Sequence, residues 1–267
     1  MADKITVPGI IKMKRQGTKI TSLTAYDYCF ARILDDAGID ILLVGDSLGN
    51  VIQGHSSTLP VTVDDMIYHT RAVVRGRRRA LVVADMPFLS YQISKEEAKR
   101  NAGRFLQEAG AEAVKVEGGV SMRETISAIV EIGIPVMGHI GLTPQSIHSF
   151  GGYKIQGKDQ RQKERIIADA VAVEAAGAFS VVLEGIPSDL AEEITGRLSI
   201  PTIGIGAGMN CDGQVLVVHD MLGLFDDFTP KFVKRYVNLK EVIAGAIESF
   251  VTDVRQQKFP GKEHSFQ

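Results

Sequence analysis

The chain has 267 residues, 45% hydrophobic and 23% charged, with a formal net charge of −2, and this length suits one large domain with a sizeable core. A pI of about 6.3 argues against a general nucleic-acid-binding protein, which normally carries a basic surface excess. No segment reaches the roughly 20 apolar residues of a membrane span, and residues 1–19 lack the apolar run of a secretory signal, so we expect a cytoplasmic protein that binds no membrane.

Short apolar runs recur along the chain, separated by segments with helical spacing. Most of the runs are continuous rather than alternating, which is typical of parallel strands covered on both faces. The predicted strands are 20–26, 41–44, 81–84, 114–116, 136–137, 181–183, 202–205 and 215–218. An extension at 1–19 precedes them, and extra helices at 231–255 and a polar tail at 256–267 follow.

The segments between the runs have recognisable helix ends. Ser94 and Ser121 are each followed three residues later by a glutamate, the pattern of a capping box that begins a helix. Glycines just beyond the apolar helical faces predict helix ends at Gly38, Gly76, Gly110, Gly133 and Gly177. Cys29 lies in an apolar helical stretch and is predicted to be in the core. It has no metal-ligand or redox spacing with Cys211.

A weak internal repeat relates 36–46, 108–117 and 175–184. In each segment a helix ends at a glycine, a strand follows, and a carboxylate stands at the end of the strand. Eight strands with intervening helices in roughly 220 residues predict a (β/α)8 barrel, with an open doubly wound sheet as the alternative. No Pro/Ser-rich linker or composition break divides the chain, so we expect one domain over 1–267.

The ends of the predicted strands carry most of the candidate functional residues. In a parallel barrel these carboxyl ends converge on one face, where active sites are built. The polar side chains at these ends are Asp46, Ser47, Asp85, Lys115, Glu117, His139, Glu184, His219 and Asp220. Crowded buried acids repel one another unless a cation or a lysine balances them. Asp46, Asp85 and Glu117 would suit Mg²⁺, whereas zinc is disfavoured because no His/Cys cluster accompanies the acids.

Each of these residues also has a purely structural interpretation. A lone aspartate after a strand is often the N-cap of the next helix, which would account for Asp46 and Asp85. Glu117 would then be the partner of Lys115, since a buried lysine is almost never unpaired. Glu184 would cap the turn that follows it. The joint occurrence of these residues at successive strand ends favours a functional site.

Three further segments have open interpretations. The glycine-rich segment 204–208 follows the seventh strand, where many barrels bind phosphate, but it is not a GxGxxG fingerprint. It indicates either close packing against a substrate or a plain tight turn. The connections 48–60 and 140–158 are long enough to serve as lids, binding loops or oligomer contacts.

Several blocks of sequence, in order along nearly the whole chain, carry a family resemblance. They are VGDSLG at 44–49, KVEGG at 115–119, GHIGLTPQ at 138–145, GGYK at 151–154 and GIGAG at 204–208. These blocks resemble the ketopantoate hydroxymethyltransferases, also called 3-methyl-2-oxobutanoate hydroxymethyltransferases.

The resemblance implies a (β/α)8 barrel of the phosphoenolpyruvate/pyruvate type with one Mg²⁺ per subunit, in a cytoplasmic homo-oligomer that is typically a decamer. It implies transfer of a hydroxymethyl group from 5,10-methylenetetrahydrofolate to 2-oxoisovalerate. The product would be 2-dehydropantoate, and the reaction would be the first committed step of pantothenate and coenzyme A synthesis.

The resemblance also implies site roles. The implied metal-site acids are Asp46, Asp85 and Glu117, the last acting directly or through water. The implied substrate contacts are Asp46, Ser47, Asp85 and Lys115. Glu184 resembles the family's proton acceptor, which would remove the C3 proton while Mg²⁺ stabilises the enolate and Lys115 balances the developing charge. His139 is placed in the pocket with no role assigned.

Two alternative functions stay open. A Mg²⁺-dependent carbon–carbon lyase acting on 2-oxo acids needs the same metal and enolate chemistry but no folate. A non-catalytic scaffold would keep the barrel and the oligomer without the chemistry. Consumption of methylenetetrahydrofolate would distinguish the transferase from the lyase. Exchange of the C3 proton would distinguish an enzyme from the scaffold.

Overall fold

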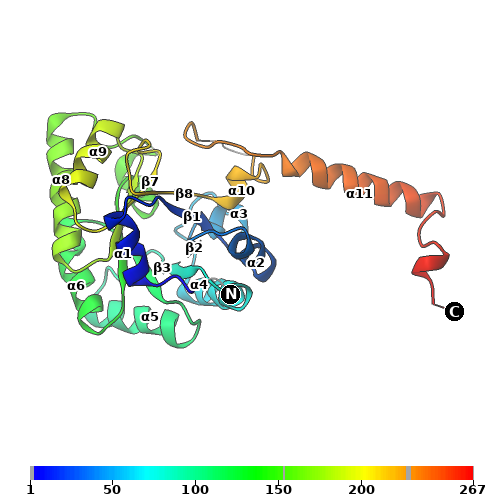
Figure 1. The fold of residues 1–267 in the computed structure, drawn as a ribbon, viewed down its shortest axis with the longest axis horizontal. Helices are drawn as coiled ribbons and strands as arrows, with labels where there is room; N and C mark the ends of the chain where they lie inside the picture. Colours follow the sequence, from blue (N-terminus) through cyan, green and yellow to red (C-terminus); the bar gives the residue numbers. More distant parts are fainter. Residues whose placement is uncertain (1–2, 153, 227–229, 267) are drawn as a thin grey trace. The chain divides into compact units, whose positions relative to one another are not determined.

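The computed structural model describes residues 3–152, 154–226 and 230–266, and the chain divides into two compact units, Met1–Val217 and Val218–Gln267. The described part of the first unit forms a closed barrel of eight parallel strands in sequence order (Figure 1). The last strand, β8 Gly213–Leu216, pairs with the first, β1 Ile20–Thr24, and thereby closes the barrel. This closure confirms the predicted (β/α)8 class and excludes the open doubly wound sheet.

The strands between β1 and β8 are short and almost entirely buried, as expected for strands covered on both faces. They are β2 Ile41–Val44, β3 Leu81–Asp85, β4 Ala113–Glu117, β5 Val136–Gly141, β6 Ser180–Glu184 and β7 Thr202–Ile205. The predicted run at 136–137 is too short. A glycine and a histidine interrupt the apolar pattern there, yet both are buried in the longer strand β5.

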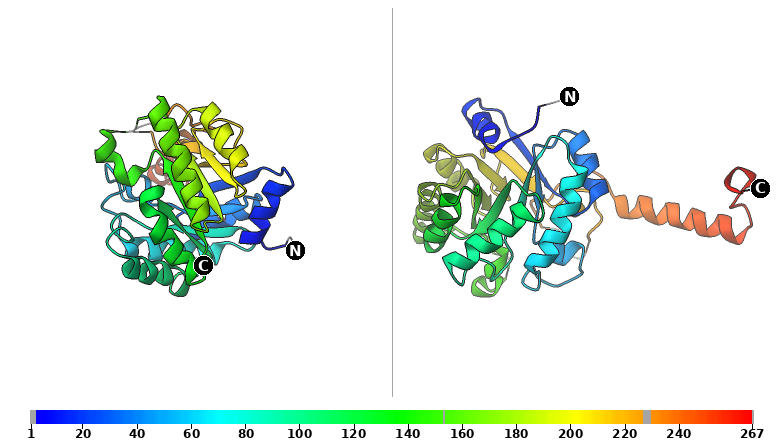
Figure 2. Two further views of the ribbon diagram at one scale, coloured as in Figure 1. Left: turned by 90° about the vertical axis from the view of Figure 1, so that its left-hand side faces the viewer. Right: turned by 90° about the horizontal axis from the view of Figure 1, so that it is seen from below.

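The helices of the first unit lie around the outside of the strands, with α1 at one end of the barrel (Figure 2). They are α1 Val7–Arg15, α2 Tyr28–Asp36, α3 Leu48–Val51, α4 Val63–Gly76, α5 Lys95–Gln107, α6 Arg123–Glu131, α7 Ile147–Phe150, α8 Gln160–Ala175 and α9 Ser188–Arg197. Two 3₁₀ turns, η1 Val120–Met122 and η2 Pro144–Ser146, precede α6 and α7.

One of the two predicted helix caps is confirmed. The Ser94 hydroxyl accepts a hydrogen bond from the Glu97 N–H and begins α5. The prediction of a cap at Ser121 is wrong, because this residue lies inside the turn η1 and α6 begins only at Arg123 without a side-chain cap.

The predicted helix-ending glycines lie where expected, but for two different reasons. Left-handed backbone follows a helix at Gly38, Gly110, Gly133 and Gly177. Gly76 is instead the last residue of α4, where an added Cβ would lie 2.5 Å from the Tyr28 carbonyl oxygen of α2, so close helix contact requires it. The prediction that Cys29 lies in the core is wrong. It is exposed, on the face of α2 opposite to the buried residues Ala31 and Leu34.

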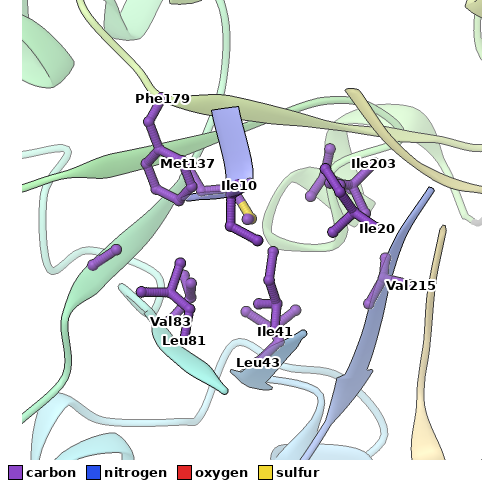
Figure 3. Packing of buried hydrophobic residues seen from close by; sticks show 12 residues of the cluster. Ile10, Ile20, Ile41, Leu43, Leu81, Val83, Met137, Phe179, Ile203 and Val215 are labelled. Carbon is purple, nitrogen blue, oxygen red and sulfur yellow. The ribbon is translucent and has the colours of Figure 1, made fainter. Parts of the chain in front are cut away.

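Helix α1 closes the N-terminal end of the barrel. Thr6 caps this helix by accepting a hydrogen bond from the Gly9 N–H. Ile10 is fully buried in an apolar cluster with residues that begin strands, including Ile20, Ile41 and Leu81, and its side chain extends toward Ile41 (Figure 3). The predicted extension at 1–19 therefore contains a helix that packs on the barrel core and leaves the carboxyl ends of the strands for polar groups.

A glycine fixes the carboxyl end of β6. Gly141 pairs with Glu184 across β5 and β6, and it has a φ of +91°. An added Cβ would lie 2.3 Å from the Glu184 carbonyl oxygen, so only glycine fits. The Leu142 N–H donates to the same oxygen at 2.8 Å. The backbone of Glu184 is thus held at the mouth of the barrel.

The second unit contains α10 Val218–Met221, α11 Leu239–Arg255 and the 3₁₀ turn η3 Lys262–His264. The extra helices predicted at 231–255 are confirmed over the range of α11 only, and the predicted strand at 215–218 is displaced, because β8 ends before α10 begins. None of the helices in the described ranges is both long enough and apolar enough to cross a membrane. The single domain over 1–267 stays a prediction.

Candidate active site

The polar residues at the carboxyl ends of β2 to β6 gather at the mouth of the barrel. Asp46, Asp85, Lys115, Glu117 and His139 are each between 3% and 6% exposed. The Glu184 side chain is somewhat more accessible, at 13%. Convergence of the strands therefore brings all six of these predicted residues into one buried cluster.

A chain of close contacts runs across this cluster from β3 to β6. The Lys115 Nζ lies 2.7 Å from Asp85 Oδ1 and 3.0 Å from His139 Nδ1. Because an ammonium group only donates, His139 Nδ1 accepts, and the proton of the neutral ring is on Nε2. That Nε2 lies 3.1 Å from Glu184 Oε2. Burial, followed by the charge of Lys115, holds the pKa of His139 well below its usual value, so the ring stays neutral.

A second set of contacts joins Asp46 to its neighbours. The Asp46 N–H donates to Asp85 Oδ2 at 3.0 Å, and Gln145 Nε2 donates to Asp46 Oδ2 at 2.9 Å. The Gln145 backbone N–H donates to Glu117 Oε2 at 3.0 Å. One hydrogen-bonded network therefore links Asp46, Asp85 and Glu117, with Gln145 between Asp46 and Glu117.

The structural interpretations of the acids do not hold. Ser94 caps α5 in place of Asp85, and α3 begins after Ser47 with no side-chain cap. The N-cap of α9 is Pro187, also without a side-chain cap, so Glu184 does not cap that helix. Lys115 makes its ion pair with Asp85 and not with Glu117. No capping role explains why these acids are buried at this point.

Ser47, the remaining predicted contact, lies next to the cluster. Its hydroxyl is partly exposed and lies 2.8 Å from the Tyr26 hydroxyl. Tyr26, Gln145 and Tyr91 are missing from the predicted site. Gln145 and Tyr91 stand in connections that the strand-end rule does not cover, and Tyr26 closes the predicted strand 20–26, although β1 ends at Thr24. The block GHIGLTPQ ends at Gln145, and this was the one signal in the sequence that included it.

Burial changes the protonation of the acids. It raises the pKa of Glu184 to about 7, with Lys115 opposing, and it raises the pKa of Asp46 to about 7 together with the charge of Asp85. Burial also raises the pKa of Glu117 well above its usual value. Although burial acts to lower the pKa of Lys115, the surrounding carboxylates raise it, so the lysine stays charged.

The charge balance of the cluster fits a bound cation. Its four carboxylates exceed its single lysine by three negative charges when all are ionised, and a dry site resists such an excess. No three Asp, Glu, His or Cys side chains in the described chain stand ready as a metal cluster. A cation here would therefore use fewer protein ligands and complete its shell with water and substrate oxygens, as Mg²⁺ commonly does.

The raised pKa values predict that stability falls as the pH rises when divalent cations are removed. A carboxyl whose folded pKa exceeds its unfolded pKa binds more protons in the folded state between those two pKa values, so over that interval each contributes a loss of up to about 1.4 kcal/mol per pH unit. For Asp46 and Glu184 the interval ends near pH 7, where the folded state ionises as well. The lowered pKa of His139 has the opposite effect, because it makes stability rise with pH up to about 6.5. The single histidine offsets only one of the two carboxyl groups.

We therefore expect the melting temperature in EDTA to fall between about pH 5 and 7 and to level off above about pH 8. In Glu184→Gln one of the two titrating groups is gone, so the slope should be smaller. A melting temperature that is constant or rises over this window in the wild type would contradict the buried, cation-deficient site.

Other predicted residues fall elsewhere. In the segment 204–208, an added Cβ at Gly208 would lie 2.5 Å from Ser188 Cβ, so packing against α9 accounts for a glycine there. His219 and Asp220 belong to α10 of the second unit. Tyr153, in the block GGYK, lies outside the described residues, and the connections 48–60 and 140–158 contain the short helices α3 and α7.

The chain resembles known proteins over its full length. The model of the family described as ketopantoate hydroxymethyltransferase matches residues 4–262. The chain is 62% identical to a 3-methyl-2-oxobutanoate hydroxymethyltransferase of Pelobacter propionicus, over 100% of this chain and 98% of that protein. It is 60% identical to the protein of the same name from Geobacter metallireducens, over the full length of both.

A solved structure supports the fold. A 2,3-dimethylmalate lyase, described as a PEP mutase/isocitrate lyase superfamily member, superposes with a TM-score of 0.59 at 15% identity, over 98% of this chain and 91% of that one. The two chains therefore share the barrel fold.

Proposed function

Because the chain belongs to the ketopantoate hydroxymethyltransferase family, we propose that it transfers a hydroxymethyl group to 3-methyl-2-oxobutanoate and gives 2-dehydropantoate, in the synthesis of pantothenate. The observation that carries this proposal for the site is the buried cluster at the barrel mouth, in which Glu184 contacts His139 and Lys115 pairs with Asp85 beside two further buried carboxylates. One-carbon transfer to the C3 carbon needs this combination.

The acids would hold Mg²⁺. Asp46 and Asp85 would be direct ligands, and Glu117 would act through water, since its Oε1 is buried without a hydrogen bond from the described part of the chain. Bound Mg²⁺ would supply Lewis-acid activation of the keto group. Lys115 would face the developing negative charge on the substrate oxygen, and its ammonium is preorganised by Asp85 and His139.

Glu184 would act as the general base. Its ionised carboxylate takes the proton from C3 as the C–H electron pair forms the bond to the keto carbon and the carbonyl pair moves onto the keto oxygen. C3 then forms a bond to the one-carbon unit, whose bonds to the folate nitrogens break with their electron pairs left on nitrogen. The overall reaction takes up one water, which supplies the hydroxyl group of the product. A pKa of about 7 suits this role, because the group is both ionised and basic near neutral pH. His139 Nε2 lies 3.1 Å from Glu184 Oε2 without a hydrogen bond between them, so His139 would act on this carboxylate as a close neutral neighbour.

The one-carbon donor would be 5,10-methylenetetrahydrofolate. A pocket of about 150 Å³ lies beside Glu117, and Phe88, Tyr91 and Met122 are among its lining residues. These side chains supply an apolar wall next to the reacting centre. Folate chemistry is what separates the proposed transferase from a carbon–carbon lyase on 2-oxo acids.

A coupled assay tests this function. Purified protein is incubated with 3-methyl-2-oxobutanoate, 5,10-methylenetetrahydrofolate and Mg²⁺. We expect 2-dehydropantoate and tetrahydrofolate to form in equal amounts, and EDTA to stop their formation. Cleavage of 2-oxo acids without consumption of folate would indicate the lyase instead, and no reaction with either substrate would favour the scaffold.

We also propose a cytoplasmic homo-oligomer. Within α11, Ile243, Ile247, Phe250 and Val254 recur at helical spacing, and none of the residues of this helix is buried in the single chain. An apolar helical face of this kind is typical of a subunit contact. The family resemblance implies a decamer, and light scattering of the full chain measures the subunit number.

A further inference from the structure

Gln145 stands at the centre of a hydrogen-bond circuit that the proposed chemistry does not use. It lies in the turn η2 after β5, and it is 6% exposed. Its Nε2 donates to Asp46 Oδ2 and to the Met86 carbonyl oxygen, both at 2.9 Å. Its backbone N–H donates to Glu117 Oε2 at 3.0 Å. One residue therefore reaches two of the acids that would bind the cation.

The orientation of this amide is determined by its partners. The Met86 carbonyl oxygen only accepts, so Gln145 must present its NH₂ group to that side, where Asp46 also lies. Its Oε1 then accepts from the Tyr91 hydroxyl at 2.7 Å and from Gln92 Nε2 at 3.2 Å. Both hydrogens and both lone pairs of the amide are used, so rotation of the group would break four hydrogen bonds at once.

Tyr91 completes the circuit with a consistent direction. Its hydroxyl accepts from the Glu117 N–H at 3.2 Å, and its single proton has two acceptors in reach, Gln145 Oε1 at 2.7 Å and the Glu117 carbonyl oxygen at 3.3 Å, of which the Gln145 oxygen is the closer. Burial, followed by the charge of Glu117, raises the pKa of Tyr91 well above its usual value, so that proton is retained. The circuit runs from the Glu117 backbone through Tyr91 to Gln145, and returns to the Glu117 carboxylate.

We propose that Gln145 is a positioning residue that takes one oxygen of Asp46 and one of Glu117, and so leaves Asp46 Oδ1 and Glu117 Oε1 to face a hard divalent cation and its water. In keeping with this, Glu117 Oε1 has no hydrogen bond from any residue that the structure describes. The inference rests on the proposed function, because it requires a cation between these acids. It adds which carboxylate oxygens are left to bind the cation and names Gln145 as the residue that occupies the others.

A merely structural role for Gln145 predicts something different. Removal of the amide would then lower the melting temperature but leave the affinity for a metal ion unchanged, as at any buried polar network. Thr202 provides a matched control at the opposite end of the barrel. It is fully buried, and its hydroxyl exchanges hydrogen bonds with Asp212 and Thr195.

The test measures binding of Mn²⁺ alone to the substrate-free full chain, by the electron paramagnetic resonance signal of the free ion, with Mg²⁺ as competitor. In Gln145→Met the side chain keeps its length but has no donor, and we expect the Mn²⁺ dissociation constant to rise at least about tenfold. In Tyr91→Phe, which removes the bond to Gln145 Oε1 and the acceptor of the Glu117 N–H but leaves both donors of the Gln145 amide in place, we expect a rise of about threefold. In Thr202→Val we expect the Mn²⁺ dissociation constant to change within about twofold, even if its melting temperature falls as far as that of Gln145→Met.

The outcomes separate the two proposals. If the wild type binds no Mn²⁺, the metal site of the proposed function is wrong, and the role of Gln145 falls with it. If the wild type binds Mn²⁺ and both Gln145→Met and Tyr91→Phe bind it equally well, only the role of Gln145 is overturned. If Gln145→Met does not fold, the comparison of Tyr91→Phe with Thr202→Val decides.

Discussion

Glu184→Gln is expected to lower the exchange of the C3 proton of 3-methyl-2-oxobutanoate by at least about 1000-fold, in line with the loss of a general base. The amide has the same shape as the carboxylate but cannot take up a proton. The measurement is release of tritium from the labelled keto acid in the presence of Mg²⁺ and without folate, which isolates proton removal from one-carbon transfer.

The pH dependence gives a second readout of the same residue. Because the pKa of Glu184 is raised to about 7 and the base must be ionised, exchange by the wild type should increase with pH through about 7. A control is Asp169→Asn. Asp169 is a partly buried acid of α8 that accepts a hydrogen bond from the Val120 N–H at 2.8 Å. In Asp169→Asn the rate of C3 proton exchange should stay within about twofold of the wild type. An exchange rate that is not reduced in Glu184→Gln would show that Glu184 is not the base.

Asp85→Asn is expected to weaken the apparent affinity for Mg²⁺ by about 100-fold or more. Asp85 pairs with Lys115 through one oxygen and accepts the Asp46 N–H with the other. Asparagine has one oxygen for these two donors, so its NH₂ group must face one of them and a buried donor is left without an acceptor. The measurement is the Mg²⁺ concentration dependence of C3 proton exchange.

Asp212→Asn is the matched control for Asp85→Asn. Asp212 also pairs with a lysine, Lys14, at 2.7 Å and also accepts a backbone N–H, that of Thr202, at 2.8 Å, but it lies at the N-terminal end of the barrel strands. This change should lower the melting temperature while the Mg²⁺ titration stays the same. An unchanged Mg²⁺ titration in Asp85→Asn itself would contradict a ligand role for that residue.

The positions of the charged residues could be predicted from the sequence, because each follows directly from a strand. Asp46, Lys115 and Glu184 stand at the carboxyl ends of apolar runs, and parallel strands in a closed barrel bring such ends together. His139 was placed in the pocket although its strand was predicted too short, since the end of that strand still pointed to the same face.

The residues that connect the acids could not be predicted in this way. Gln145 and Tyr91 lie in connections whose paths depend on how distant segments pack, and no local period marks them. Local patterns also misled at Ser121, where a 3₁₀ turn competes with the helix start, and at Cys29, where the apolar stretch does not reveal which face of the helix is outside.

Helix α1 covers the N-terminal end of the barrel, so the polar cluster lies at the other end. Ile10 and its neighbours fill the N-terminal end of the barrel with apolar side chains, so we expect water to reach Glu184 from the carboxyl ends of the strands, the side by which the keto acid would enter. A bound keto acid then stands between this carboxyl group and the solvent. We expect the proton taken from C3 to exchange slowly with solvent while the keto acid is bound. Part of it should therefore return to C3 of the unreacted keto acid.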